Sequence, residues 1–280
     1  MKILNGKIVR DSIAAKMVRE IKKLQVQPKL VIIQVGNDVA SSVYVRQKKL
    51  FGEKLGFFVE YVQYEKGIAQ NELTANIADF NSRRDVHGII VQLPLPKKLD
   101  ALAVIEAIDP KKDVDGMHSE NLRLLLEGRD GGFVPATTKG ILSLLDFYKL
   151  PIAGKKVVIV GRSLLVGRPT ALALLNRDAT VLMCHSKTKN LSEETKSADI
   201  LIVAIGKPHF ITKKFVKAGQ VIIDVGISRV EGGIFGDVDF ASVSKIARAI
   251  TPVPGGVGPM TVVSLFENVL LACRRQQAVL

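Results

Sequence analysis

The chain has 280 residues, 47% hydrophobic and 24% charged, values that exclude disordered, collagen-like and disulfide-stapled proteins. At roughly 150 residues per domain, this length predicts about two domains. Basic residues outnumber acidic ones by 40 to 27, a formal net charge of +13, yet they are spread along the chain without a polybasic block. Aromatic residues make up only 5% and Trp is absent, which disfavours stacking on nucleic acid, so we expect no nucleic-acid partner.

The mean hydropathy of +0.22 raises the question of a membrane span. No segment approaches the ~18 uninterrupted apolar residues that a spanning helix needs. At the N-terminus Asp11 interrupts the sequence before a signal-peptide core forms. We therefore expect a cytoplasmic protein without a membrane partner. Cys184 and Cys273 fit a reducing compartment, although the sequence leaves their pairing open.

Short apolar runs alternate with segments of helical period along the whole chain, which predicts an α/β fold with largely parallel sheets. In the first half Ile13, Met17 and Ile21 recur at helical spacing, as do Leu73 and Ile77. The expected strands of this half are 30–35, 57–64 and 88–93. Those of the second half are 157–160, 180–183, 200–204 and 221–225.

Two stretches lack regular periodicity. Residues 116–138 carry several glycines and Pro135, so we place a domain boundary there. Residues 251–259, rich in Pro and Gly, precede an apolar helix that we expect over 261–274.

The first strand of the second half runs into a glycine turn at Gly161 and Gly167 and then a helix, the arrangement that aims backbone amides at a pyrophosphate. Ser163 and Val166 replace two glycines of the usual fingerprint, so the turn alone leaves a ligand-free loop equally open. About twenty residues on, an NAD site would have a carboxylate, but this strand end offers Ser186 and Lys187. A strand end with a hydroxyl and a positive charge, together with Arg162 in the glycine turn, can accept a 2′-phosphate and therefore predicts NADP rather than NAD.

Tyr44 and Lys48 lie four residues apart on a predicted helix that Ser41 is placed to cap. A solvated amphipathic helix is the simpler interpretation of that pair. Gln92 is the one amide in an apolar strand, where it must find a partner in a site or in a loop backbone. Asp115 follows Lys112 in a turn that resembles part of a calcium loop without its later ligands, so we expect no metal. It is either a turn residue or a carboxylate presented to a nitrogen-rich ligand.

Motifs along nearly the whole chain resemble, in order, those of the bifunctional methylenetetrahydrofolate dehydrogenase/methenyltetrahydrofolate cyclohydrolase family. They are Tyr44-Val-x-x-Lys48, Val91-Gln-Leu-Pro-Leu-Pro96, Lys112-Asp-Val-Asp-Gly116, Gly161-Arg-Ser-x-x-Val-Gly-x-Pro169, Gly236-Asp-Val-Asp239 and 251–261. The resemblance implies NADP-dependent oxidation of 5,10-methylenetetrahydrofolate and hydrolysis of the methenyl product to 10-formyltetrahydrofolate in one cleft. It also implies a homodimer and tetrahydrofolate derivatives, possibly polyglutamylated, as ligands.

The implied fold is a two-domain α/β protein. An N-terminal folate domain spans 1–117 and is completed by a C-terminal helix, 261–280, that returns to it. A Rossmann-like NADP-binding domain spans 118–260. A monofunctional member of the family and a catalytically silent folate-binding protein are the alternatives.

The resemblance also implies residue roles. Lys48 is the catalytic lysine, Tyr44 positions the substrate, Gln92 supports Lys48, and Asp115 holds the pterin. Gly161, Arg162, Ser163, Ser186 and Ile227 match nucleotide-contacting positions, and Lys187 joins them by its charge. The matches to a folate wall are Val91, Leu93, Pro254, Gly255, Gly256 and Pro259. Because a lysine with its usual pKa is a poor base at neutral pH, we expect desolvation to lower the pKa of Lys48. The sequence departs from the family pattern at Val39, Met117, Arg123 and Thr138.

Overall fold

A computed structural model describes residues 1–230 and 232–278, apart from the side chains of residues 39 and 40. The chain divides into two compact units, which are described separately. Unit 1 comprises Met1–Ser12 and Thr137–Val263, and unit 2 comprises Ile13–Ala136 and the chain from Ser264 onward. Two long helices, α1 (Gly6–Ile21) and α10 (Val257–Gln277), contribute residues to both units.

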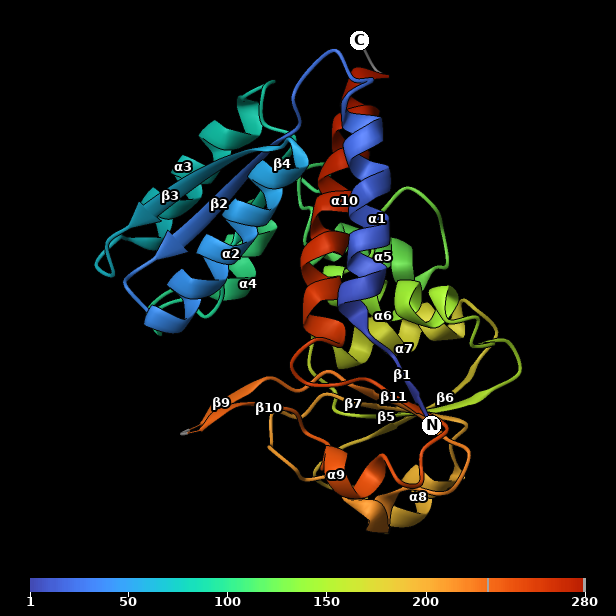
Figure 1. The fold of residues 1–280 in the computed structure, drawn as a ribbon. Helices are drawn as coiled ribbons and strands as arrows, with labels where there is room; N and C mark the ends of the chain where they lie inside the picture. Colours follow the sequence, from blue (N-terminus) through green and yellow to red (C-terminus); the bar gives the residue numbers. More distant parts are fainter. Residues whose placement is uncertain (231, 279–280) are drawn as a thin grey trace. The chain divides into compact units, whose positions relative to one another are not determined.

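Unit 2 is built on a parallel sheet in which β2 lies between β3 and β4 (Figure 1). The strands are β2 (Lys29–Val35), β3 (Phe58–Tyr64) and β4 (Gly88–Val91). The helices are α2 (Val39–Leu55), α3 (Gln70–Ser82), α4 (Ala101–Glu106) and α5 (Ser119–Leu126). Val31, Ile33 and Ile89 are fully buried, as expected when helices cover a parallel sheet.

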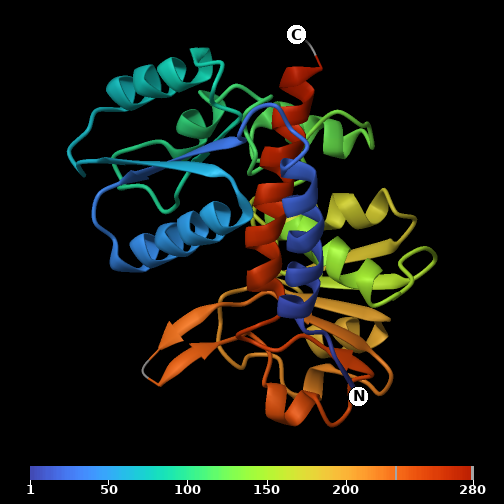
Figure 2. The same cartoon turned by 45° about the horizontal axis from the view of Figure 1, so that its top comes forward.

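Unit 1 contains a six-stranded sheet of order β1-β11-β8-β7-β5-β6, and each paired neighbour is parallel. Its yellow to orange strands lie together in the lower part of Figure 2. Its strands are β1 (Lys2–Ile3), β5 (Lys156–Val160), β6 (Thr180–Cys184), β7 (Ile200–Val203), β8 (Val221–Asp224) and β11 (Ala249–Ile250). Its helices are α6 (Ala136–Phe147), α7 (Gly167–Leu175), α8 (Leu191–Ser197), α9 (Phe240–Val243) and the short 3₁₀ helix Lys213–Phe215. A separate antiparallel pair consists of β9 (Ser228–Val230) and β10 (Gly233–Phe235).

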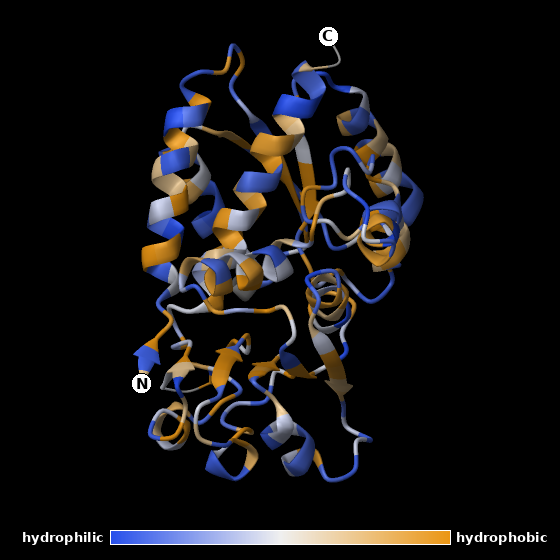
Figure 3. Ribbon diagram, turned by 90° about the vertical axis from the view of Figure 1, so that its right-hand side faces the viewer, coloured by the Kyte–Doolittle hydropathy of each residue, from blue (hydrophilic) through white to orange (hydrophobic). Residues whose placement is uncertain are grey.

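The apolar strands and helix faces form the cores of both units, and hydrophobic residues dominate the strands in Figure 3. The α10 helix is long and apolar enough to meet a membrane-span criterion, although no such segment was expected; 61% of that window is buried inside the protein. Within unit 2 the ring of Phe266 on α10 packs 4.9 Å from that of Phe57. A Cβ atom on Gly52 would lie 2.4 Å from the Phe266 ring, so only glycine allows this approach.

Several expected boundaries differ from the structure. The last helix begins at Val257 rather than at residue 261, because its first turn accommodates Pro259, whose missing N–H is not needed there. The irregular stretch 116–138 contains α5, where His118 accepts a hydrogen bond from the Glu120 amide as an N-cap.

The domain limits also shift. Residues 118–136 group with unit 2 instead of the expected NADP domain, and residues 1–12 group with unit 1. The physical reason for the second shift is that β1 pairs with β11 at the edge of the six-stranded sheet. A two-residue strand at one end of the chain gives no sequence signal of its partner.

Candidate functional site

Lys48 and Gln92 come together in unit 2 although they are far apart in sequence. Lys48 lies on α2, and Gln92 follows the carboxyl end of β4. The Lys48 Nζ donates a hydrogen bond of 3.0 Å to the Gln92 Oε1, and the Gln92 Nε2 donates one of 2.7 Å to the carbonyl oxygen of Leu93. The second bond fixes the amide so that its oxygen points at the lysine.

Electrostatics distinguish Lys48 from an ordinary surface lysine. Burial lowers the pKa of its ammonium group, and the negative charge of Asp115 opposes that effect. Burial raises the pKa of the Asp115 carboxyl group, and the charge of Lys48 opposes that shift in turn. Each group therefore favours the ionised form of the other in a place where solvation is weak. Lys48, Gln92 and Asp115 form one cluster, which we call the lysine cluster.

The turn that carries Asp115 is held by two residues shortly before it, Lys112 and Asp113. The buried Asp113 carboxylate accepts hydrogen bonds from the His118 amide, at 2.7 Å, and from the Asn121 Nδ2, at 2.9 Å. The buried Lys112 Nζ donates to the carbonyl oxygens of Asn81 and Arg83. Both side chains are thus committed to the fold. Within the described residues no group of His, Cys, Asp and Glu could hold a metal ion.

Tyr44 lies one turn before Lys48 on α2 and is half-buried. The cap of this helix is Asp38, whose carboxylate accepts a 2.7 Å hydrogen bond from the Ser41 amide, so the expectation of a serine cap was wrong. The helix begins at Val39, so Ser41 already lies within its first turn and Asp38 is the residue in the capping position. The family departure at Val39 concerns a side chain outside the described part of the protein.

Of the predicted folate-wall residues in unit 2, Val91 is almost fully buried in the core and Leu93 is half-buried. Pro254, Gly255, Gly256 and Pro259 belong to unit 1. There the carbonyl oxygen of Gly255 accepts a 2.9 Å hydrogen bond from the Gly6 amide. The role of all these residues in folate binding stays a prediction.

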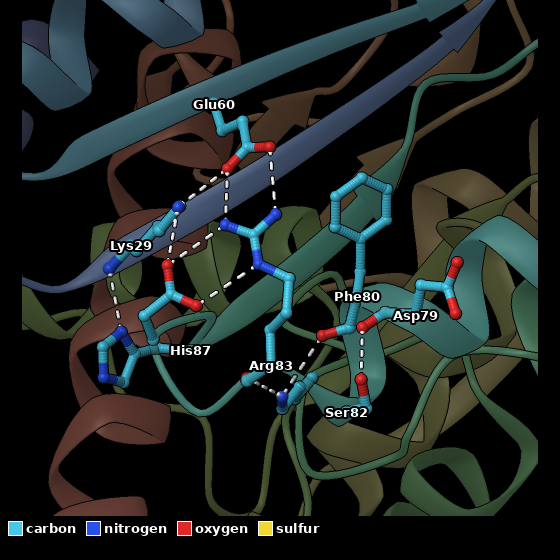
Figure 4. A network of polar contacts seen from close by, with 9 residues as sticks. Lys29, Glu60, Asp79, Phe80, Ser82, Arg83 and His87 are labelled. Carbon is cyan, nitrogen blue, oxygen red and sulfur yellow. Dashed lines mark hydrogen bonds and ion pairs between the residues drawn. The ribbon is translucent and has the colours of Figure 1, made fainter.

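A second polar network lies near the amino ends of the strands β2 and β4 of unit 2 (Figure 4). Gln92, by contrast, follows the carboxyl end of β4. Arg83 donates to both oxygens of Glu60, at 3.1 and 3.0 Å, and also pairs with Asp85. Lys29 pairs with both carboxylates, and its amide donates to the His87 Nδ1. Because each charge in this network has a partner, we assign it to holding the strands rather than to binding.

The glycine turn of unit 1 has the geometry of a nucleotide cradle. Gly161 has φ 126°, and a Cβ atom there would lie 2.2 Å from the Ala204 carbonyl oxygen. A Cβ atom on Gly167 would lie 2.3 Å from the Gly161 carbonyl oxygen. The Ser163 Oγ accepts hydrogen bonds from the amides of Val166 and Gly167, at 3.2 and 3.4 Å, where α7 begins. Gly161 is therefore required for the close approach of the turn to the end of β7, and Gly167 for the tight path of the turn itself.

The residues expected to contact the nucleotide are accessible. Arg162, Ser163, Ser186 and Lys187 are exposed, and Ile227, after β8, is 42% exposed. The Gly161 amide donates to the Cys184 carbonyl oxygen at 2.9 Å, so the turn adjoins the end of β6 that carries Ser186 and Lys187. No carboxylate stands between Cys184 and Thr188. This donor set fits a nucleotide with a 2′-phosphate.

Three family departures have clear structural settings. Thr138 is fully buried, and its hydroxyl is 2.9 Å from that of Thr170, which satisfies both. Met117 is buried, and Arg123 is a surface residue paired with Glu120 and Glu127. Sequence reasoning missed the roles of Asp38 and Asn121, since only their contacts reveal them.

The chain is similar to known proteins along nearly its whole length. Residues 4–115 match the family model described as tetrahydrofolate dehydrogenase/cyclohydrolase, catalytic domain, and residues 135–277 match the NAD(P)-binding domain of the same family. The bifunctional protein FolD of Acholeplasma laidlawii is 48% identical over 98% of this chain and 99% of its own. The structure of the bifunctional FolD enzyme from Campylobacter jejuni has a TM-score of 0.97 at 43% identity, covering 98% of this chain and 99% of that one. A Trypanosoma brucei enzyme of this type, solved with NADP and an inhibitor, has a TM-score of 0.92 at 33% identity and covers 98% and 97% of the two chains.

Proposed function

This chain belongs to the tetrahydrofolate dehydrogenase/cyclohydrolase family, and we propose that Lys48 is the proton-transferring residue of its hydrolytic reaction. The enzyme oxidises 5,10-methylenetetrahydrofolate with NADP and hydrolyses the resulting 5,10-methenyl cation to 10-formyltetrahydrofolate. The observation that carries the assignment of Lys48 is its hydrogen bond to an amide oxygen that is itself fixed by Leu93.

The chemistry of hydrolysis suits the lysine cluster. Water adds to the bridging carbon of the methenyl cation and must lose a proton as the tetrahedral intermediate forms. A carbon–nitrogen bond then breaks, and that nitrogen takes up a proton. A neutral amine can accept the first proton, and burial favours the neutral form of Lys48. The Gln92 oxygen holds the amine in place, while we assign Asp115 to the polar edge of the pterin and Tyr44 to substrate positioning.

The oxidation asks less of the protein side chains. NADP, when bound, supplies the hydride acceptor, and the chain contributes binding and orientation. In unit 1 the exposed Arg162, Ser186 and Lys187 supply donors and positive charge for phosphate groups, and the Gly161 turn lets the backbone approach. Ser163 and Ile227 complete the set that we propose for the nucleotide.

A two-step assay with purified protein tests this function. Nicotinamide reduction from 5,10-methylenetetrahydrofolate reports the oxidation, and the disappearance of methenyl absorbance reports the hydrolysis. We expect both, with a higher kcat/KM for NADP than for NAD. Oxidation alone or hydrolysis alone would identify a monofunctional enzyme, and folate and NADP binding without turnover would identify a silent protein.

The Asp115→Asn variant tests the electrostatic coupling in the lysine cluster. Since the neutral amine is the active form, hydrolysis should rise with pH and level off above the pKa of Lys48, which burial holds below its ordinary value. Removing the negative charge of Asp115 lowers that pKa further, so the rising limb should move to lower pH. The KM for the folate should also rise. The measurement is kcat for hydrolysis against pH at saturating methenyl substrate. A pH profile identical to that of the unaltered enzyme would contradict the electrostatic coupling of Asp115 to Lys48.

The Lys187→Glu variant tests the choice of nucleotide. It places a carboxylate where a 2′-phosphate would bind, so kcat/KM for NADP should fall by about tenfold or more, as expected for a lost charge-assisted contact. The value for NAD should change little. The matched control is Lys189→Glu, which makes the same charge change at a neighbouring exposed position. Equal losses with both nucleotides would reject the proposed role of Lys187.

We further propose a cytoplasmic homodimer without a membrane or nucleic-acid partner. Exposed Val230 on β9 gives unit 1 an apolar surface residue that a second copy can cover. Sedimentation equilibrium at several concentrations tests the assembly, and a monomer throughout would reject it.

A further inference from the structure

The GDVD motif at 236–239 carries two buried features that the catalytic roles above leave unexplained. Asp237 is fully buried, and its carboxylate accepts hydrogen bonds from three successive backbone amides: Ile205 and Gly206 to Oδ2, at 2.7 and 2.9 Å, and Lys207 to Oδ1, at 2.6 Å. These amides form the loop directly after β7. One carboxylate therefore satisfies all three successive amides of this turn.

Asp224, at the end of β8, forms the other half of the arrangement. Its Oδ1 accepts from the amides of Gly226 and Asp237, at 2.9 and 3.0 Å, and its Oδ2 accepts from Val238, at 2.9 Å. The first bond fixes the backbone one residue before Ile227. The two others tie this loop to Asp237 and so to the loop after β7. We call Asp224 and Asp237 together the aspartate clamp.

Two glycines make room for the clamp. A Cβ atom on Gly226 would lie 2.3 Å from the Asp237 Cγ, and one on Gly236 would lie 2.0 Å from the Asp224 Oδ2. Each glycine thus lets the carboxylate of the other loop approach its backbone. The fit is reciprocal, so a change at either aspartate is expected to disturb both loops.

The strand order indicates which part of the nucleotide these loops face. The strand β5 lies between β6 and β7, so the chain adds β6 on one side of β5 and the following strands on the other side. In α/β sheets, ligands bind at the carboxyl ends of the strands beside such a switch point. Ser186 and Lys187, at the β6 end, suit the 2′-phosphate of the adenosine half. The loops after β7 and β8 lie on the other side of β5, and the Ala204 carbonyl adjoins Gly161 itself. We therefore assign the nicotinamide half of the nucleotide to the loops after β7 and β8.

We propose that Asp237 and Asp224 are positioning residues that hold the loops after β7 and β8 in the conformation that receives the nicotinamide half of NADP. The inference rests on the proposed dehydrogenase function. The clamp acts through backbone that it orders and needs no contact with the nucleotide itself. Its loss should weaken the binding of whole NADP and leave the adenosine half unaffected.

The test compares Asp237→Asn and Asp224→Asn with the unaltered enzyme by calorimetry, using NADP and adenosine 2′,5′-bisphosphate as probes. An amide cannot replace both carboxylate oxygens as acceptors, so in Asp237→Asn the Kd for NADP should rise by about tenfold or more, the scale of losing charge-assisted hydrogen bonds. The Kd for the bisphosphate and the rate of methenyl hydrolysis should stay within about twofold, because pockets assembled by other residues bind those ligands. Asp224→Asn should show the same pattern.

The matched control is Asp239→Asn, which alters a nearby carboxylate that caps α9 by accepting from the Ser242 amide. It should bind NADP as the unaltered enzyme does. Unchanged NADP affinity in both clamp variants would overturn the inference. Equal loss of NADP, bisphosphate and methenyl hydrolysis would also overturn it, since that pattern belongs to general support of the fold. If the unaltered enzyme lacked both activities, the proposed function itself would fail instead.

Discussion

Replacing Lys48 by Met should abolish methenyl hydrolysis, with a loss of about 10²- to 10⁴-fold in kcat, the usual contribution of a positioned proton-transfer group. Met keeps the length and apolar stem of the side chain but cannot accept a proton or donate to the Gln92 Oε1. Hydride transfer requires no proton transfer from this amine, so NADP-dependent oxidation should retain a measurable rate. The measurement is the two-step assay with each substrate supplied separately.

Lys49→Met is the matched control for this experiment. Lys49 is adjacent in sequence, half-exposed and 3.9 Å from Glu53, a surface pair of small energetic value. The variant should keep both activities. Lys48→Arg adds a second check, because a guanidinium stays protonated and cannot act as the base. Wild-type hydrolysis in Lys48→Met would reject the assignment of Lys48.

Replacing Gly161 by Ala should selectively damage the dehydrogenase reaction. Ala at φ 126° is strained, and its methyl group would lie 2.2 Å from the Ala204 carbonyl oxygen, so the turn must move away from β7. A displacement of about 1 Å in a binding loop costs on the order of 10²-fold in rate. We expect a loss of that size in kcat/KM for NADP, together with weaker NADP binding by calorimetry. Methenyl hydrolysis should persist.

Gly154→Ala is the control that separates the effect of backbone strain at positive φ from the effect of the steric clash with Ala204. Gly154 precedes β5 in the same unit with φ 70°, but a Cβ atom there meets nothing within 4 Å. This variant should lose some thermal stability and keep its affinity for NADP. If Gly161→Ala bound NADP as tightly as the unaltered enzyme, the assignment of the Gly161 turn to NADP binding would be rejected.

The buried aspartates predict a stability effect of opposite direction to ordinary acid denaturation. Burial raises the pKa of both Asp113 and Asp224 to about 6. A carboxyl group with a raised pKa in the folded state binds its proton more tightly there than in the unfolded chain. Its contribution to stability is therefore complete below its ordinary pKa of 3.8 and is lost as pH rises through about 6.

Chemical unfolding of Asp224→Asn and the unaltered enzyme between pH 4 and 8 checks this. The variant should show a smaller decline in the free energy of unfolding between about pH 4 and 6 than the unaltered enzyme. Identical pH dependence would indicate that the carboxyl group of Asp224 titrates normally.

The sequence by itself determined the fold class, the strands β2–β8 and the two chemical motifs. Parallel strands buried on both faces must be continuously apolar, so β2, β5 and β7 stand out as Val- and Ile-rich runs. The Gly161 turn and the absence of a carboxylate near Ser186 are local patterns, legible without any distant partner. The local sequence around Lys48, by contrast, is that of an ordinary solvated helix, and only the motifs along the whole chain indicate its role.

Only the tertiary structure decided which distant residues meet. The hydrogen bond from Lys48 to Gln92 joins residues 44 positions apart, and the bonds from the 205–207 loop to Asp237 span about 30 positions. The pairing of β1 with β11 likewise joins opposite ends of the chain. Such contacts depend on how strands are ordered in a sheet and on which glycines leave room for them. Local sequence encodes the periodicity of each element but not its neighbour, so the aspartate clamp emerges only from the folded protein.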